Sequence, residues 1–306
     1  MKKIHNDIEL CVDIMYIQGL TFFVTISKKI KYITIEHIKS RSKSSMDKAF
    51  DTVFQVYNKA GFRISKVYGD PEFEMMRNTF IDLDIELNSA SAQEHVPEVE
   101  RAIRVIKERF RALYHRLPYQ AIPKNMIIIG AMECARWLNF FPPKGGVSEY
   151  YSPHIIMMGK AIDYNKHCTT AFGTYVQALT ENNPTNTTEQ RTIGCIYLRS
   201  LENEQGGYEL LDLNTGRVIS RRKYYEIPVT QQVINRVEEL AHHDGIRPDL
   251  VFQDRKGDLL MNDLIAGVDD DEYQDENEDE DPNYINNDDG DRDEELIAYD
   301  ELDDEE

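Results

Sequence analysis

The stretch E-L-C-V-D-I-M-Y-I-Q-G-L-T-F-F-V-T-I-S, residues Glu9–Ser27, decides the fold. It contains two short apolar runs, 9–15 and 20–27, separated by a Gln-Gly pair. This pattern predicts a β-hairpin that turns near Gly19. A third run, K-Y-I-T-I-E at 31–36, predicts another strand, so three antiparallel strands open the fold.

The segment after the third strand carries helix signals. S-S-M-D-K-A-F-D-T-V-F-Q-V-Y-N-K-A-G-F predicts a helix with a capping box of Ser44 and Asp47. Met46, Phe50, Val53 and Tyr57 form its apolar stripe, and Gly61 serves as the terminating glycine.

Strand and helix signals then alternate: a strand at 62–70, a helix at 71–80, a strand at 84–88, a helix opening at Pro97 and one more at 124–138. Three strands followed by helix, strand, helix, strand and helix is the order of a ribonuclease H-like fold. We therefore expect an α/β domain with a mixed sheet and flanking helices.

Residues beyond about 145 show short β-like segments between Asn, Pro, Thr and Gly turns, which predicts a small β-barrel-like domain. The expected divisions are a catalytic core at 1–144, a β-rich domain at 145–260 and a disordered acidic tail at 261–306.

The net charge of -20 is concentrated at one end. Residues 269–306 hold 22 of the 55 acidic residues and one basic residue, Arg292, so the rest of the chain is nearly neutral. The tail has too few apolar residues to offset the entropy of ordering it, which predicts a disordered linker or acidic interaction segment. The overall charge therefore does not exclude nucleic acid as a partner of the body.

No signal peptide or long apolar run is found, so we expect no membrane partner. The four cysteines show no C-x-x-C pair, which favours a reduced intracellular protein.

The run E-H-V-P-E-V-E-R-A-I-R-V-I-K-E-R, Glu94–Arg109, begins an amphipathic helix with a basic outer face. Arg101, Arg104, Lys107 and Arg111 lie on that face and can contact phosphates, although a solvated surface helix has the same pattern.

Three acids have positions suited to chemistry in this arrangement: Asp13 in the first strand, Asp70 at the end of the fourth, and Glu98 at the start of the helix. Grouped carboxylates repel unless cations lie among them, and hard oxygen ligands suit Mg²⁺ or Mn²⁺. Two such ions support phosphodiester chemistry. Spacing alone does not single out these acids, since Asp82, Asp84, Glu94 and Glu100 are equally available.

The same run, together with T-F-F-V-T-I-S, V-Y-N-K-A-G-F, Y-S-P-H-I-I-M-M-G-K and Q-G-G-Y-E-L-L-D-L-N-T-G-R-V-I-S-R-R, resembles the integrase region of Copia-type long-terminal-repeat retrotransposon polyproteins. The resemblance covers roughly residues 8 to 255. It implies a ribonuclease H-like catalytic core with an Asp, Asp, Glu triad and Mg²⁺ or Mn²⁺, which trims element DNA ends and joins them to target DNA.

Carried over by position, the resemblance makes Asp13, Asp70 and Glu98 the catalytic metal ligands. It also implies DNA partners, a homo-oligomer when active, and a nuclear location or cytoplasmic particles. Two departures from the family stand out. Only 27 residues separate Asp70 from Glu98, fewer than the family usually has, and this sequence contains neither the upstream His/Cys zinc-binding domain nor the protease and the reverse transcriptase of the polyprotein.

Three readings follow. The chain is an active integrase-like polynucleotidyl transferase, or a catalytically inactive nucleic-acid-binding remnant of a polyprotein, or an acidic-tailed interaction protein unrelated to DNA.

Overall fold

The computed structural model describes residues 6–89, 96–180, 188, 190–202 and 206–252. All of them belong to the first of two units of the chain, Met1–Met261. The second unit, Asn262–Glu306, contains most of the predicted acidic tail and lies outside the described residues. The division of the chain into three domains stays a prediction.

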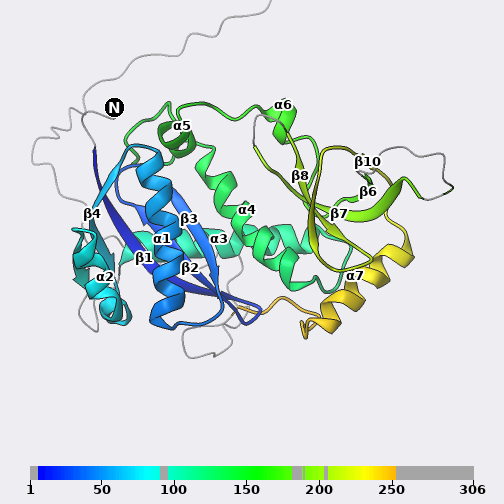
Figure 1. The fold of residues 1–306 in the computed structure, drawn as a ribbon, viewed down its shortest axis with the longest axis horizontal. Coiled ribbons are helices and arrows are strands. Elements are labelled where there is room, and N and C mark those ends of the chain that lie inside the picture. The colour runs from blue at the N-terminus through cyan, green and yellow to red at the C-terminus, as the bar shows by residue number, and fades with distance from the viewer. Residues whose placement is uncertain (1–5, 90–95, 181–187, 189, 203–205, 253–306) are drawn as a thin grey trace, which may run out of the picture. The chain divides into compact units, whose positions relative to one another are not determined.

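The first sheet has five strands in the order β3-β2-β1-β4-β5 (Figure 1). β1 pairs antiparallel with β2, and β2 with β3, whereas β1–β4 and β4–β5 are parallel. This confirms the predicted mixed sheet, in the strand order of the ribonuclease H-like arrangement. Its strands are β1 (Asp7–Ile17), β2 (Leu20–Ser27), β3 (Ile33–Ile38), β4 (Arg63–Gly69) and β5 (Glu86–Ser89).

The predicted hairpin between β1 and β2 is confirmed. Gln18 and Gly19 occupy the turn with φ values of 52° and 72°. Positive φ at both central residues is the geometry of a type I′ turn, whose twist matches that of the paired strands.

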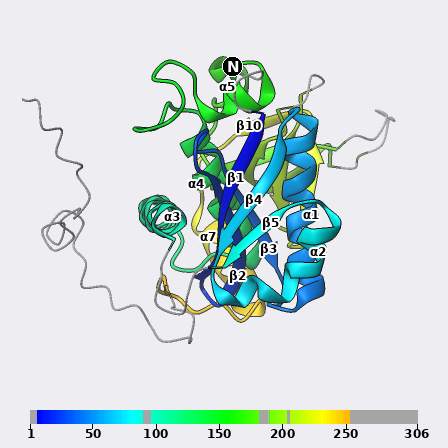
Figure 2. The same cartoon turned by 90° about the vertical axis from the view of Figure 1, so that its left-hand side faces the viewer.

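Helices cover both faces of this sheet, as Figure 2 shows: α1 and α2 lie on one side and α3 on the other. Alternate residues of β1 serve the two faces, with Leu10, Val12 and Ile14 facing α1 and with Cys11 and Met15 facing α3 and α4. The helical elements of this region are α1 (Lys43–Lys59), the 3₁₀ helix η1 (Pro71–Met76), α2 (Arg77–Asp82), α3 (Pro97–Arg116) and α4 (Lys124–Asn139).

Some local predictions were wrong. α1 begins two residues earlier than the predicted capping box implies, with Ser42 in place of Ser44 as its N-cap and no side-chain capping bond. Asp47 does not close a capping box with Ser44, because its carboxylate accepts hydrogen bonds from Lys43 and Thr79 instead. The helix expected at 71–80 divides into η1 and α2, and β3 lies two residues later than predicted.

α4 packs against β3 of the first sheet and β7 of the second. At its last residue, the Asn139 side chain accepts a hydrogen bond from the Ile33 N–H and donates one to the Ile33 carbonyl, both at 2.8 Å. Two short helices, α5 (Pro153–Met158) and α6 (Tyr164–His167), follow it. No helix in the described ranges is both long and apolar enough to span a bilayer.

The second sheet is antiparallel, in the order β10-β6-β7-β8-β9. The aromatic rings of Tyr208 on β8 and Tyr224 on β10 lie 4.7 Å apart although two strands separate them, so the sheet is strongly curved. Its strands are β6 (Tyr175–Leu179), β7 (Thr192–Ser200), β8 (Tyr208–Asp212), β9 (Val218–Arg221) and β10 (Tyr224–Glu226).

The predicted barrel is not closed. In the part of the chain that the structure describes, β9 and β10 are the two edges of the second sheet, and no ladder joins them. Both are short, with four and three residues, and only Arg222 and Lys223 connect them, which leaves little strand for pairing.

The last described segment returns to the first sheet after α7 (Gln231–His243). Phe252 forms a β-bridge with Ile17, and the Gln18 N–H donates to the Val251 carbonyl at 2.9 Å. Phe252 is only 3% exposed, so this return buries a large aromatic side chain against the first hairpin.

Candidate functional site

Strand register places two of the predicted acids side by side. The last parallel pair between β1 and β4 joins Cys11 to Tyr68, and two residues farther along each chain are Asp13 and Asp70. Asp70 has an extended backbone, with φ −69° and ψ 167°, so it continues the direction of β4. Neighbouring strands lie about 4.8 Å apart. The two aspartates, which are 7% and 8% exposed as residues, therefore occupy equivalent positions on adjacent strands.

A glycine precedes Asp70 because no side chain fits there. A Cβ at Gly69 would lie 2.7 Å from the Phe73 ring and 2.8 Å from a Val12 methyl carbon. The close packing of Gly69 against these two residues fixes the path of the chain as it leaves β4. Asp70 is thereby positioned by its neighbours as well as by the strand.

Asp13 has a second acid nearby that the sequence interpretation missed. The Asp13 Oδ1 accepts a hydrogen bond from the Ile14 N–H at 2.6 Å. The second acid is Glu72, whose pKa burial raises. The Arg41 guanidinium, 3.5 Å from the Glu72 carboxylate, opposes that rise. The nearby charge of Asp13 adds to the rise, which shows that the two acids interact. The only sequence signal for Glu72 was its place two residues after Asp70.

Glu98 lies in the first turn of α3, directly after Pro97, as predicted. It faces the same side of β1 as Asp13, because its Oε2 lies 4.0 Å from the Cys11 Sγ and Cys11 is two residues before Asp13. Two strand residues span about 6.6 Å. Burial, with a contribution from Glu98, raises the pKa of Cys11 to about 12, so its thiol stays protonated.

The three acids therefore share one sheet face but do not form a single ligand group. Within residues 6–89 and 96–252 as far as they are described, no three His, Cys, Asp or Glu side chains are grouped closely enough to hold a metal ion. The structure brings Asp13 to Asp70, and it directs the Glu98 carboxylate toward Cys11.

Cations lie beside these acids. The Lys28 ammonium is 3.5 Å from the centre of the Tyr68 ring, and the Tyr68 hydroxyl donates to Glu9 at 2.9 Å. The charges of Lys28 and Lys31 also lower the pKa of Cys11, against the larger effect of burial. This sheet face therefore carries both carboxylates and ammonium groups near the start of α3.

The predicted basic face of α3 divides into two halves. Arg101 and Arg104 are exposed, and Arg104 pairs with Glu108 at 3.4 Å. Lys107 and Arg111 lie over the ring of Phe252, at 5.9 and 5.2 Å from its centre. Their position shows that half of the face covers the returning C-terminal segment.

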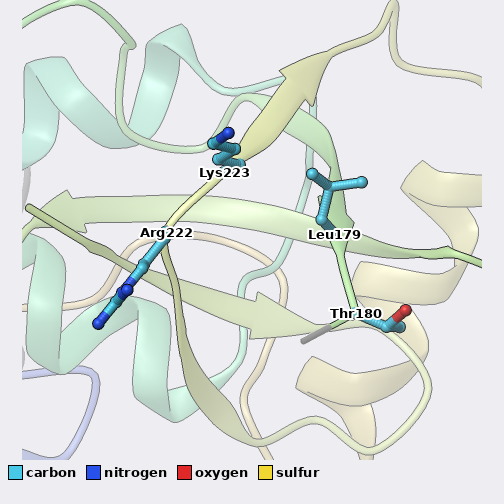
Figure 3. Close-up of a pocket in the computed structure, with 4 residues that line it drawn as sticks. All are labelled: Leu179, Thr180, Arg222 and Lys223. Atoms are coloured by element: carbon cyan, nitrogen blue, oxygen red, sulfur yellow. The ribbon is translucent and has the colours of Figure 1, made fainter. Parts of the chain in front are cut away.

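The basic run at the β9–β10 connection lies beside a cavity of about 470 Å³ lined by Leu179, Thr180, Arg222 and Lys223. Figure 3 shows that the Arg222 and Lys223 side chains point in different directions from the connection. They therefore do not converge on one anion position.

Comparisons with known proteins add little. No protein-family model matches the chain, and no curated protein matches it. Among solved structures, the catalytic core domain of BIV integrase is similar at 15% sequence identity, with 49% of this chain and 93% of that chain covered and a TM-score of 0.38. A similarity of this degree carries no argument about the site. The Copia type stays a prediction.

Proposed function

We propose that this chain is an integrase-like polynucleotidyl transferase core that processes DNA ends and transfers strands. The observation that supports it most is the register of β1 and β4, which aligns Asp13 with Asp70 on one sheet face. Glu98 lies on the same face, at the start of α3.

The donor chemistry of the site suits Mg²⁺ or Mn²⁺, because carboxylate oxygens are the ligands these ions prefer. Asp13 and Asp70 fit as ligands in type and placement, whereas Glu98 fits in type only, since its carboxylate faces Cys11. A bound divalent cation would activate a water or hydroxyl and stabilise the leaving oxygen of a phosphodiester. Arg101 and Arg104, exposed on α3, would hold the DNA backbone.

A second candidate function is an inactive nucleic-acid-binding remnant. The contact of Glu98 with Cys11, in place of a three-carboxylate group, favours it. A remnant would keep the fold and salt-sensitive DNA binding without metal-dependent cleavage.

The deciding experiment is nicking and strand transfer on a labelled DNA duplex with Mg²⁺ or Mn²⁺. We expect the parent to be active and both Asp70→Asn and Glu98→Gln to lose at least 100-fold in rate. Asp82→Asn, an exposed acid at the end of α2, serves as the matched control and should stay near the parent. An inactive parent that still binds DNA would favour the remnant.

The proposal also includes DNA ends and target DNA as partners, a homo-oligomer as the working form, and a nuclear or particle-associated location. The second sheet would hold DNA or a neighbouring subunit in that assembly.

A further inference from the structure

A second cavity lies away from Asp13, Asp70 and Glu98. It has a volume of about 600 Å³ and is bounded by the C-terminal half of α3, by α4, by residues 167–172 and by β7. Arg109, at the cavity, lies eleven residues after Glu98 along α3, a distance of about 16 Å in a helix. The cavity is therefore distinct from the proposed catalytic face.

Two arginines stand at this cavity on one side of α3. Arg109 and Arg116 both line it and are exposed, and they are two helical turns apart. No ion pair joins either guanidinium to an acid in the described part of the chain. Arg136 also lines the cavity, but Glu133 and Glu202 already engage it. The two α3 arginines are thus available to an anionic ligand.

The rest of the lining is mixed, and it includes three aromatic rings and a buried carboxyl group. Trp137, Phe172 and Tyr197 contribute to the walls. Glu133, 4% exposed, also lines the cavity, and its Oε1 has no hydrogen-bond partner among the described residues. A ligand with a planar apolar ring, N–H donors and a phosphate would match all three features. Base stacking on aromatic side chains combined with basic contacts to phosphate is how single strands are usually held.

We propose that this cavity binds one unpaired nucleotide, with the base against the aromatic wall and the phosphate on Arg109 and Arg116. Its volume lies in the range of small-ligand pockets. The nucleotide comes either from a DNA single strand or as a free mononucleotide. Binding here requires no divalent cation, so it is separable from the proposed catalysis.

Trp137 makes the test specific, because it is the only tryptophan of the chain and it lines the cavity. Its fluorescence would be followed in EDTA during titration with a short single-stranded oligonucleotide, a mononucleotide, an abasic strand and inorganic phosphate. We expect quenching by the oligonucleotide or the mononucleotide, whichever is the source, and at least tenfold weaker binding of the abasic strand and of phosphate.

Ala112 provides a matched pair of variants. It is exposed, lines the cavity, and lies three residues after Arg109 and four before Arg116. Ala112→Glu would engage both arginines in helical ion pairs and should weaken nucleotide binding at least tenfold. Ala112→Gln, of the same size without the charge, should stay within about threefold of the parent.

Circular dichroism spectra would show that both Ala112 variants are folded. The proposal is overturned by an absence of quenching in the parent, by equal quenching with phosphate alone, or by equal affinities of the two variants. Because every titration is done without metal, an inactive catalytic face does not affect the result.

Discussion

Glu133 is an acid that folding places in an unfavourable position for its charge. It is 4% exposed, and only its Oε2 has a partner, the Arg136 guanidinium at 2.5 Å. Burial raises its pKa to about 7, and the charge of Arg136 only partly offsets that effect. The carboxyl group is therefore partly protonated at neutral pH in the folded protein and ionised in the unfolded chain.

This difference predicts a pH dependence of stability. The folded state binds the proton more tightly than the unfolded state, whose Glu has a pKa near 4.5. The stabilisation is full below that value and is lost as the pH rises to about 7. We expect the free energy of unfolding of the parent, relative to Glu133→Gln, to fall by at most about 3 kcal/mol between these pH values. Urea denaturation of both proteins across this pH range measures the difference in free energy of unfolding. Parallel pH profiles of the two proteins would contradict the prediction.

The aligned pair Asp13 and Asp70 predicts a metal effect that does not require catalysis. Millimolar Mg²⁺, at about ten times its dissociation constant, should add roughly 1.4 kcal/mol to the stability of the parent. For a chain of this size that is a rise in Tm of about 3–5 °C. Differential scanning fluorimetry should show the rise in the parent and in Asp82→Asn but not in Asp70→Asn. An equal rise in all three would place the metal elsewhere.

At the scale of elements, the two halves of α3 place their basic side chains in different surroundings. Its N-terminal half presents Arg101 and Arg104 to solvent, and its C-terminal half directs Lys107 and Arg111 at Phe252. Long basic side chains of this kind cover apolar surface with their stems.

This division predicts a difference in DNA binding. Replacing both Arg101 and Arg104 by Ala should reduce the slope of log affinity against log salt by about 2, since each phosphate contact contributes about 0.9. The matched double variant at Lys107 and Arg111 should change the slope less and lower the stability more. Fluorescence anisotropy at several salt concentrations measures the slopes. Equal changes in both variants would show that the whole face binds DNA.

Periodicity in the sequence predicted the elements of the first sheet well, because hydrophobic spacing reports directly on burial. The Gln-Gly turn and the apolar stripe of α3 are examples. Periodicity did not predict the side-chain hydrogen bonds that depend on tertiary contacts. Asp47 was expected to cap α1 but bonds Thr79, 32 residues away, and Asn139 was not expected to anchor Ile33 from the end of α4.

The candidate site was predictable only in part. The element order indicated that Asp13 and Asp70 could reach one point, because the strands that carry them lie side by side in a ribonuclease H-like fold. It could not show that the Glu98 carboxylate faces Cys11, because a side-chain direction at a helix start depends on how the helix packs on the sheet. The cavity between α3, α4 and β7 was not predicted, since its lining comes from four separate segments.

At the scale of the whole molecule, charge is distributed very unevenly. The net charge is -20, and residues 269–306, which lie outside the described residues, carry about −21, so the rest of the chain is close to +1. Charge of this sign repels DNA over distances of about the Debye length.

Removing residues 269–306 should therefore strengthen DNA binding several-fold at low salt. The gain should disappear at about 0.5 M salt, where screening shortens the range of the repulsion. Binding assays with the full chain and the truncated chain at both salt concentrations measure it. Unchanged affinity at low salt would show that the tail does not affect DNA binding.

The contact between the first hairpin and Phe252 has a consequence for biosynthesis. The Gln18 N–H donates to the Val251 carbonyl, and Ile17 forms a β-bridge with Phe252, so this turn leaves the ribosome long before the last described segment, which completes it. The nascent chain can form its hairpin locally within microseconds. More than two hundred further residues must then be translated before the tip of that hairpin can contact Val251 and Phe252.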